Sequence, residues 1–325
     1  MEPTTAGERC QATLDRVSDA VIAENDFLST VLTGVLSRGH VLIEDVPGTG
    51  KTLTARTLAE TLGLSFSRIQ FTPDLLPTDV TGTHIFDEQE NTFEFNEGPV
   101  FANMVLADEI NRAPPKTQAA LLEAMGEGQV TVDGDRFDLP EPFFVIATQN
   151  PVEQEGTFPL PEAQLDRFII KTEMGYPGPE GELELLNRRE KRNMKIPTAD
   201  TQLTPDEVQA LQQVPEQITV TEDLKRYMIQ LTQATRDDNR TNIGVSPRGL
   251  QRLYEASRAR AVMLGRDYVT PEDVQQLAQP VLAHRLVLET EAKVNDVSKR
   301  DIVDNVLQRV SVPGAESSGG ASPAN

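Results

Sequence analysis

The chain has 325 residues, which is long enough for two domains that each bury a hydrophobic core. Its 51 acidic and 30 basic residues give a net charge of −21, and such an acidic field would repel a nucleic-acid backbone. A single cysteine, Cys10, excludes an internal disulfide. Neither an apolar run of about 18 residues nor a signal-peptide pattern occurs, so a cytoplasmic protein without a membrane span is expected.

The first 38 residues predict a helical segment, because apolar side chains such as Val17, Val21, Leu28 and Leu32 recur at helical spacing. From residue 40 onward, short apolar strands alternate with helices. The expected strands are 40–44, 64–71, 103–108, 142–148 and 168–173, and one of the helices between them is expected at 115–126. Such alternation predicts a parallel sheet in a three-layer α/β domain.

A glycine-rich turn follows the first strand and leads into a helix, in the sequence Glu44-Asp45-Val46-Pro47-Gly48-Thr49-Gly50-Lys51-Thr52-Leu53. This arrangement holds a nucleoside triphosphate. Backbone N–H groups face the phosphates, Lys51 reaches the β- and γ-oxygens, and the Thr52 hydroxyl binds Mg²⁺. The residues expected to bind the nucleotide are Val46, Gly48, Thr49, Gly50, Lys51, Thr52 and Leu53. Asp45 stands where the general pattern has glycine.

Two hairpins interrupt the alternation of strands and helices. Residues 82–86 and 92–95 flank a polar turn, and residues 129–132 and 136–139 flank the tight-turn sequence Asp133-Gly134-Asp135. Either hairpin could be purely structural.

An apolar strand ends in two carboxylates, Asp108 and Glu109. Acidic side chains at the end of a buried strand are costly unless they serve a metal or a reaction. With a phosphate loop upstream, we expect Asp108 to orient the Mg²⁺ shell and Glu109 to polarise the attacking water. The alternative is a strand that simply ends in solvated acids.

Three further polar residues are candidates for catalysis. Asn150 follows another buried strand and would help to position the water, unless it only forms an Asn-Pro turn. Arg167 would stabilise transition-state charge in a neighbouring subunit, or else pair locally with Asp166. Arg248 lies in the first turn of a helix that Ser246 caps. The helix dipole disfavours a cation there, and a bound phosphate would remove that conflict.

The segment Pro177-Gly178-Pro179 marks a boundary, beyond which only helices are expected. Their ranges are 179–193, 204–213, 221–236, 247–264, 271–288 and 297–310. We therefore predict four parts, which are an N-terminal helical segment (1–38), a nucleotide-binding αβα domain with two hairpin inserts (39–176), an α-helical lid domain (177–312) and a disordered tail (313–325).

Together these segments resemble an AAA+ ATPase of the MoxR family. The stretches that carry the resemblance are HVLIEDVPGTGKT (40–52), FTPDLLPTDVTG (71–82), VLADEINRAPPKTQAALLEAM (105–125), ATQNP (147–151), FPLPEAQLDRF (158–168) and SPRG (246–249). The resemblance runs from about residue 15 to 310. It implies a P-loop αβα domain with a helical lid, assembled into a ring that is commonly a hexamer.

The resemblance also implies roles for single residues. Residues 45–52 and 105–109 would be the Walker A and Walker B motifs, and the two hairpins would line the ring. Asn150 would be sensor 1, Arg167 the arginine finger and Arg248 sensor 2. Arg112, just after Walker B, competes with Arg167 for the part of the intersubunit arginine. Asp45 is usual at its position in MoxR-like sequences.

MoxR-like ATPases are similar in role to chaperones, because they use ATP and Mg²⁺ to remodel or assemble other protein complexes. A von Willebrand factor A-domain protein is often their partner. Three other functions compete with this one. They are a ring motor acting on nucleic acid, a GTP-using enzyme, and a nucleotide-binding scaffold without hydrolysis. The acidic turn at 133–135 suits a nucleic-acid motor poorly, and the complete acidic pair argues against a scaffold. A guanine-selecting motif is matched only imperfectly, at 298–301.

Only eight of the basic residues are lysines. A Lys-poor surface rich in Asp and Glu is typical of adaptation to high salt, where hydrated carboxylates keep a protein soluble. The alternative is an ordinary acidic cytosolic protein.

We therefore expect the melting temperature to rise steeply from about 0.1 M to molar KCl, because at low salt 51 carboxylates repel one another over a Debye length of about 10 Å or more. Thermal unfolding across a KCl series measures this. A melting temperature that does not change with salt would contradict adaptation to high salt.

Overall fold

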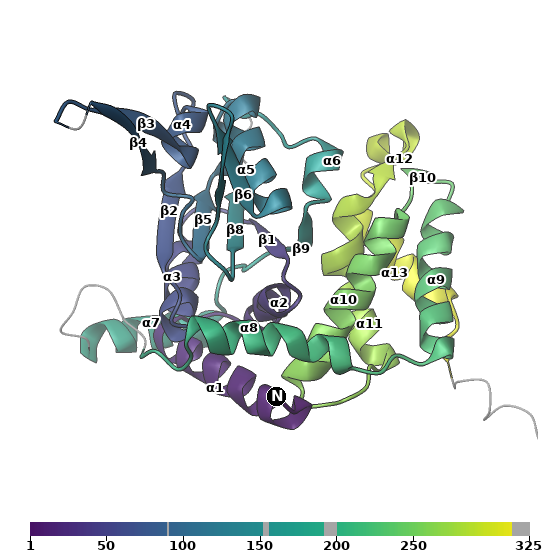
Figure 1. Cartoon of the computed structure of the whole chain (residues 1–325). Coiled ribbons are helices and arrows are strands. Elements are labelled where there is room, and N and C mark those ends of the chain that lie inside the picture. Colours follow the sequence, from purple (N-terminus) through teal and green to yellow (C-terminus); the bar gives the residue numbers. More distant parts are fainter. Residues whose placement is uncertain (90, 152–155, 192–199, 314–325) are drawn as a thin grey trace, which may run out of the picture.

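Five parallel strands form the central sheet of the structure, a computed structural model that describes residues 1–89, 91–151, 156–191 and 200–313. The strands are β1 (His40–Glu44), β2 (Phe66–Gln70), β5 (Met104–Asp108), β8 (Phe144–Gln149) and β9 (Phe168–Thr172). Their spatial order is β2-β5-β8-β1-β9 (Figure 1), and every pairing is parallel. The predicted α/β fold is confirmed. The first and last residues of each expected strand lie within two residues of those observed.

Alternate residues of the central strands pack on opposite faces of the sheet. Val41 of β1 belongs to a core shared with α2 (Asn25–Leu36) and α3 (Lys51–Thr61), whereas Leu42 belongs to a second core shared with α5 (Pro115–Glu127). Burial on both faces explains why these strands are almost continuously apolar. The domain therefore has three layers, with helices on both sides of the sheet.

The N-terminal segment consists of α1 (Pro3–Ala20) and α2, and it joins the sheet to the lid. α1 contacts both α3 and the lid helix α10 (Pro247–Met263). Gly7 of α1 lies so close to the turn after α10 that a Cβ built on it would stand 2.6 Å from the backbone of Gly265. One hydrophobic core continues from the sheet through α1 and α2 into the lid helices.

Both predicted hairpins are present. β3 (Gly82–Asp87) pairs with β4 (Thr92–Glu97), and β6 (Gln129–Val132) pairs with β7 (Asp135–Asp138). The turn Asp133-Gly134 has positive φ at both residues, as an Asp-Gly hairpin turn favours.

The two hairpins contact each other through their side chains. The rings of Phe95 and Phe137 stack with centroids 3.8 Å apart, and His84 Nδ1 lies 3.0 Å from Asp133 Oδ2. The β3–β4 hairpin projects from the edge of the domain (Figure 1), so this contact steadies it against the second hairpin.

The lid is built mainly from α9 (Glu222–Arg236), α10, α11 (Pro271–Leu282) and α13 (Lys299–Arg309). The expectation of helices alone is wrong in one place, because the helix predicted at 271–288 ends at Leu282. The chain continues as the 3-10 turn η3 (Ala283–Arg285) and the strand β11 (Val287–Leu288), which pairs with β10 (Thr241–Ile243).

Two residues near the end of α11 weaken its continuation. Pro280 has no N–H to donate in the last turn of the helix, and the buried Arg285 side chain donates to the carbonyl of Ile169 in β9. The remaining elements are α4 (Pro77–Thr81), η1 (Ile110–Arg112), α6 (Glu162–Leu165), α7 (Pro179–Lys191), α8 (Pro205–Gln213), η2 (Val214–Gln217) and α12 (Thr290–Val294).

The proposed domain boundaries stay predictions. Residues 192–193 of an expected helix and 314–325 of the expected tail lie outside the described residues. Within the described ranges, no helix is long and apolar enough to cross a membrane.

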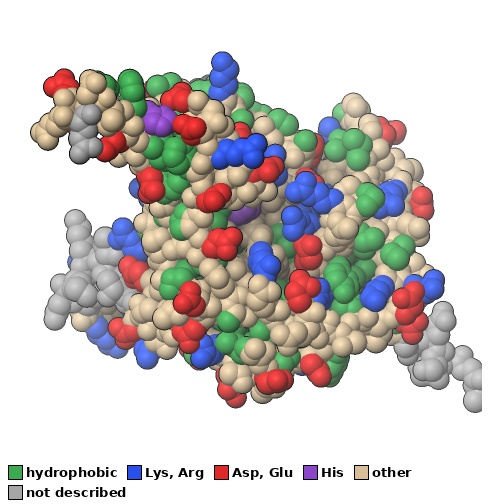
Figure 2. All heavy atoms as spheres, in the orientation of Figure 1, with side chains coloured by type: hydrophobic (Ala, Val, Ile, Leu, Met, Phe, Trp, Pro, Cys, Tyr) green, Lys and Arg blue, Asp and Glu red, His purple; other side chains and the backbone are tan. Residues whose placement is uncertain are grey.

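Acidic side chains are spread over the face shown in Figure 2, and basic side chains gather where the nucleotide-binding domain meets α10.

Gly7→Ala should lower the melting temperature, because the atoms that its Cβ would meet belong to the backbone and cannot move aside. We expect a loss of about 1–3 kcal/mol in the free energy of unfolding. Elsewhere in a helix the same change stabilises by about 0.5–1 kcal/mol. Glu8→Ala, on the exposed side of α1, is the control. A Gly7→Ala protein as stable as the wild type would contradict the close packing of α1 on the lid.

Candidate functional site

A pocket of about 420 Å³ opens at the carboxyl ends of β1, β5 and β8. It is lined by Asp45, Pro47, Gly48, Gly50, Lys51, Thr52, Leu53, Arg68, Asp108, Glu109, Thr148, Gln149 and Asn150. Polar groups from several strands therefore meet the N-terminus of α3 at the carboxyl edge of the sheet, which is the side where the carboxyl ends of the parallel strands lie. Parallel α/β folds bind their ligands at this edge.

The phosphate loop has a backbone shape that depends on its glycines. Gly48 and Gly50 have φ angles of 88° and 102°, in the left-handed region that residues with a side chain disfavour. α3 begins directly afterwards at Lys51, so the first N–H groups of the helix are at the pocket. Unpaired N–H groups at a helix start form a natural site for phosphate.

The Lys51 ammonium lies over this loop. Its Nζ donates to the carbonyl oxygens of Val46 (2.5 Å) and Asp45 (3.2 Å) and to the hydroxyl of Thr49 (3.3 Å). Val46 and Thr49, which we expected to bind the nucleotide, contact Lys51 and are not among the residues that line the pocket. Burial lowers the pKa of Lys51, and three nearby carboxylates oppose that shift.

Asp45 ties the phosphate loop to the segment that follows β9. Its Oδ1 accepts from the backbone N–H of Val46 at 2.7 Å, and its Oδ2 accepts from the N–H groups of Met174 (3.1 Å) and Gly175 (2.8 Å). A glycine, which the general pattern has at this position, could form none of these bonds. The exchange of glycine for aspartate therefore adds a link between the loop and the connection to the lid.

Hydrogen bonds from β8 hold the two acids at the end of β5. The Thr148 hydroxyl donates to Asp108 Oδ1 at 2.6 Å and accepts from the backbone N–H of Glu109 at 2.9 Å. Glu109 has a left-handed backbone, with φ 56° and ψ 49°. This conformation costs on the order of 1 kcal/mol for a residue with a side chain, and such strain tends to collect at functional sites.

Two residues of β2 contact these acids, and sequence reasoning missed both. Arg68 donates to Asp108 Oδ2 from Nε (3.2 Å) and Nη2 (2.6 Å), and Gln70 donates to Glu109 Oε2 at 2.7 Å. Arg112 donates to the same oxygen at 3.1 Å. The spacing of 68 and 70 places both on one face of a strand. The sequence alone does not show that β2 pairs with β5, and this pairing brings both residues to the acids.

The oxygen donors of the pocket suit Mg²⁺ bound together with phosphates. Thr52 and Asp108 both line the pocket and offer the hydroxyl and carboxylate oxygens that this ion prefers. Over the described ranges, no group of three or more His, Cys, Asp or Glu side chains could hold a metal ion. Mg²⁺ keeps several waters and takes phosphate oxygens as ligands, so the hydroxyl and the carboxylate would be the protein's share of its ligands.

A smaller cavity of about 170 Å³ is lined in part by Met174 and Gly175, the residues whose N–H groups Asp45 binds. Residues after α1, including Ile22 and Ala23, form part of its lining, and residues after β9, including Met174 and Tyr176, form another part. Met174 also reaches α3, where the Thr54 hydroxyl lies 3.8 Å from its sulfur. Met174 therefore lies between α3 and this cavity, whose lining also includes Glu24 and Glu180.

Of the three further candidates, only Asn150 lines the larger pocket. Arg167 lies against α5, where its Nη1 donates to the carbonyl of Leu122 at 2.6 Å. Arg248 lies at the start of α10, with its Nε 3.5 Å from Asp166 Oδ2. The carboxylate of Asp166 supplies the negative charge that a helix start favours.

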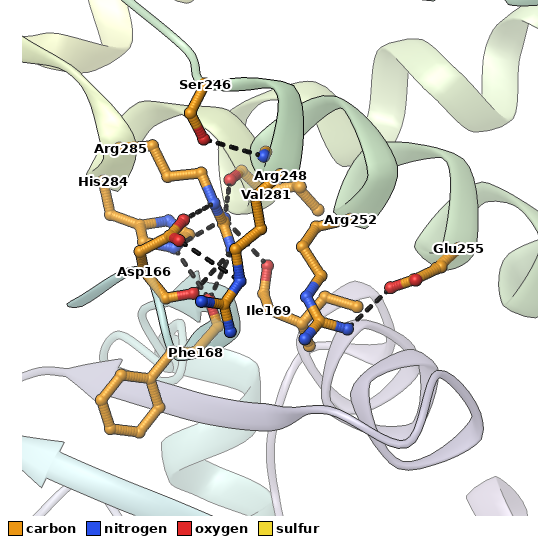
Figure 3. Close-up of polar contacts among 11 residues, drawn as sticks. Asp166, Phe168, Ile169, Ser246, Arg248, Arg252, Glu255, Val281, His284 and Arg285 are labelled. Carbon is orange, nitrogen blue, oxygen red and sulfur yellow. Dashed lines mark hydrogen bonds and ion pairs between the residues drawn. The ribbon is translucent and has the colours of Figure 1, made fainter. Parts of the chain in front are cut away.

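Asp166 joins the start of β9 to the lid (Figure 3). Its Oδ1 accepts from Nε of Arg285 at 2.8 Å, beside the contact with Arg248. The guanidinium of Arg285 is buried and also donates to the carbonyl of Phe168 at 2.8 Å. Burial lowers the pKa of Arg285 to about 10, and Asp166 opposes the shift, so the side chain stays charged at neutral pH. Asp166 therefore pairs with lid arginines, and not with Arg167.

Comparison with known proteins identifies two family domains. Residues 40–170 match the ATPase family associated with various cellular activities (AAA), and residues 233–306 match the AAA lid domain. The chain is 47% identical over 300 residues to the uncharacterized protein YeaC of Bacillus subtilis, covering 92% of this chain and 93% of that protein.

The chain is also similar to the chaperone MoxR1 of Mycobacterium tuberculosis, with 43% identity over 306 residues that cover 91% of this chain and 80% of MoxR1. A crystal structure from Cytophaga hutchinsonii, proposed to be an ATPase, superposes with a TM-score of 0.88 at 40% identity, covering 95% of this chain and 96% of that one. With these relatives and the phosphate-loop pocket, the chain belongs to the MoxR family of AAA+ ATPases.

Proposed function

We propose that this protein hydrolyses ATP with Mg²⁺ and uses the energy to remodel or assemble protein complexes, as a ring of identical subunits that is commonly hexameric. The observation that carries the hydrolysis is that Lys51, Thr52, Asp108 and Glu109 line a single pocket. The chaperone name of the similar MoxR1 protein supports the remodelling role. A von Willebrand factor A-domain partner is a further proposal, which rests on the family alone.

The side chains of the pocket divide the chemistry among them. Lys51 and the first N–H groups of α3 would hold the phosphates, while Thr52 and Asp108 would hold Mg²⁺, which neutralises phosphate charge when bound. Glu109 is the carboxylate that would accept a proton from the attacking water. Gln70 and Arg112 restrain that carboxylate, since both donate to its Oε2.

The cavity lined by residues after α1 and after β9 supports a nucleotide ligand rather than free phosphate. A flat, partly apolar base fits a recess lined by Ile22, Ala23 and Met174. The link between Asp45 and the N–H groups of Met174 and Gly175 would then place the base and the phosphates in a fixed relation.

Sheet topology supports an active site that is shared between subunits. The phosphate loop follows the carboxyl end of β1, whereas Arg167 precedes β9, which runs parallel to β1 with Phe168 beside His40. A strand of five residues spans roughly 16 Å, so Arg167 lies at the opposite edge of the sheet from its own pocket. Arg248 is held at the same edge through Asp166. Both arginines are thus suited to a neighbour's phosphates.

Two substitutions test the hydrolysis. Lys51→Ala should abolish nucleotide binding, because it removes the charge that meets the phosphates. Glu109→Gln should keep nucleotide binding and lose turnover by roughly 10²-fold or more, because only the proton-accepting carboxylate is gone. A fluorescent nucleotide titration and a phosphate-release assay measure the two effects. If Glu109→Gln hydrolyses ATP at the wild-type rate, the assignment of Glu109 is wrong.

A mixing experiment tests the shared site. Arg167→Ala should nearly eliminate turnover, with ATP affinity close to normal, because an arginine finger contributes about 10³-fold or more. Lys51→Ala subunits still carry Arg167, and Arg167→Ala subunits still bind ATP. An equal mixture of the two inactive proteins should therefore regain activity at the interfaces that pair an intact pocket with an intact arginine.

Energy transfer between labelled subunits provides the control, because it reports whether the two variants enter common rings. A mixture that exchanges subunits and stays inactive would show that Arg167 does not serve a neighbour. Arg112 would then be the better candidate for the intersubunit arginine.

A further inference from the structure

The side chain of Arg167 lies against α5 beside Gly126, which has no side chain. Its Nη1 donates to the carbonyl of Leu122 at 2.6 Å, one turn before Gly126. A Cβ built on Gly126 would stand 2.0 Å from Nη1 and 3.2 Å from Cζ of Arg167. The guanidinium therefore occupies the space that any other residue at 126 would fill.

Helix geometry does not require glycine at this position. Gly126 lies inside α5 and is absent from the glycines with positive φ, whereas the glycine that ends the helix, Gly128, has a φ of 65°. Glycine is also a poor helix former compared with alanine. Within 4 Å, the three atoms nearest to the added Cβ all belong to the Arg167 guanidinium. Arg167 is thus the feature of the fold that accounts for a glycine at 126.

We propose that Gly126 is a positioning residue for Arg167. Because Gly126 has no side chain, it leaves a space on α5, called here the Arg167 seat, in which the guanidinium binds the carbonyl of Leu122. This contact would hold the guanidinium in the position in which it acts on the neighbouring subunit. This inference rests on the proposed function, in which Arg167 acts on the next subunit's ATP. A free arginine side chain loses much rotamer freedom when it is ordered. A seat that orders it before ATP arrives removes that cost from the reaction and fixes the donors in place.

The seat leaves part of the guanidinium available to a ligand. The hydrogen bond to Leu122 engages Nη1. In the described part of the chain, Nε and Nη2 of Arg167 have no hydrogen-bond partner. Gly126→Ala would displace the guanidinium without a clash against backbone, because the end of a long side chain can move. A misplacement of about 1 Å can cost on the order of 10²-fold in rate.

The test places Gly126→Ala in one kind of subunit at a time. The donor carries Lys51→Ala and provides Arg167, and the acceptor carries Arg167→Ala and provides the pocket. Their mixture is the reference. With Gly126→Ala added to the donor, kcat of the mixture should fall by about tenfold or more while KM for ATP stays unchanged. With Gly126→Ala added to the acceptor, the activity should equal the reference, because that subunit no longer has an arginine to position.

Two controls separate positioning from folding. The melting temperature of Gly126→Ala should equal or exceed that of the wild type, because alanine favours the helix. Glu127→Ala, which changes the adjacent exposed residue of α5, should leave the donor as active as the reference donor.

Each outcome of the mixing experiment has one meaning. A Gly126→Ala donor as active as the reference donor overturns the role of Gly126 and leaves the shared site standing. Equal losses in donor and acceptor also overturn it, since they indicate a general effect on α5. An inactive reference mixture in rings with proven exchange overturns the shared site, and the role of Gly126 with it.

Discussion

The buried guanidinium of Arg285 is the contact on which the arrangement of the two parts of the molecule depends. A charge in an apolar interior is costly unless several acceptors surround it. Arg285 finds them in the carboxylate of Asp166 and the carbonyls at the start of β9. Because the arginine belongs to the lid and its acceptors to the sheet, satisfying the charge fixes the lid against the last strand. The same contact holds the start of β9, the strand that Arg167 precedes.

The parallel sheet separates the nucleotide pocket from Arg167 and Arg248, the arginines proposed to serve a neighbouring subunit. Strand ends of one polarity share an edge, so the phosphate loop, Asp108 and Asn150 converge at the carboxyl edge. Arg167 lies at the amino edge. A single subunit therefore carries the pocket on one side and, on the other, the arginines that we propose act on a neighbouring subunit. Identical subunits arranged head to tail can bring these two edges together, and closed rings are the usual result of such heterologous contacts.

Much of this could be predicted from the sequence because it is encoded locally. The glycines of the phosphate loop, the apolar strand ending in Asp108 and the Asp-Gly turn all depend on neighbouring residues. Contacts between distant segments could not be predicted in the same way. Arg68 and Gln70 reach the acids only because β2 pairs with β5. The early end of α11 likewise depends on Arg285 meeting β9, more than 100 residues away in the chain.

Residues that break local preferences gather around these two edges. Glu109 takes a left-handed backbone, Gly126 weakens the last turn of a helix, and Arg248 brings a positive charge to the start of another. Each is unfavourable on its own. In each case a residue distant in the sequence compensates. Thr148 accepts from the backbone N–H of Glu109. Arg167 fills the space at Gly126, and Asp166 pairs with Arg248. Conflicts that neighbours in sequence cannot relieve, and that tertiary contacts do, are expected where function constrains the chain.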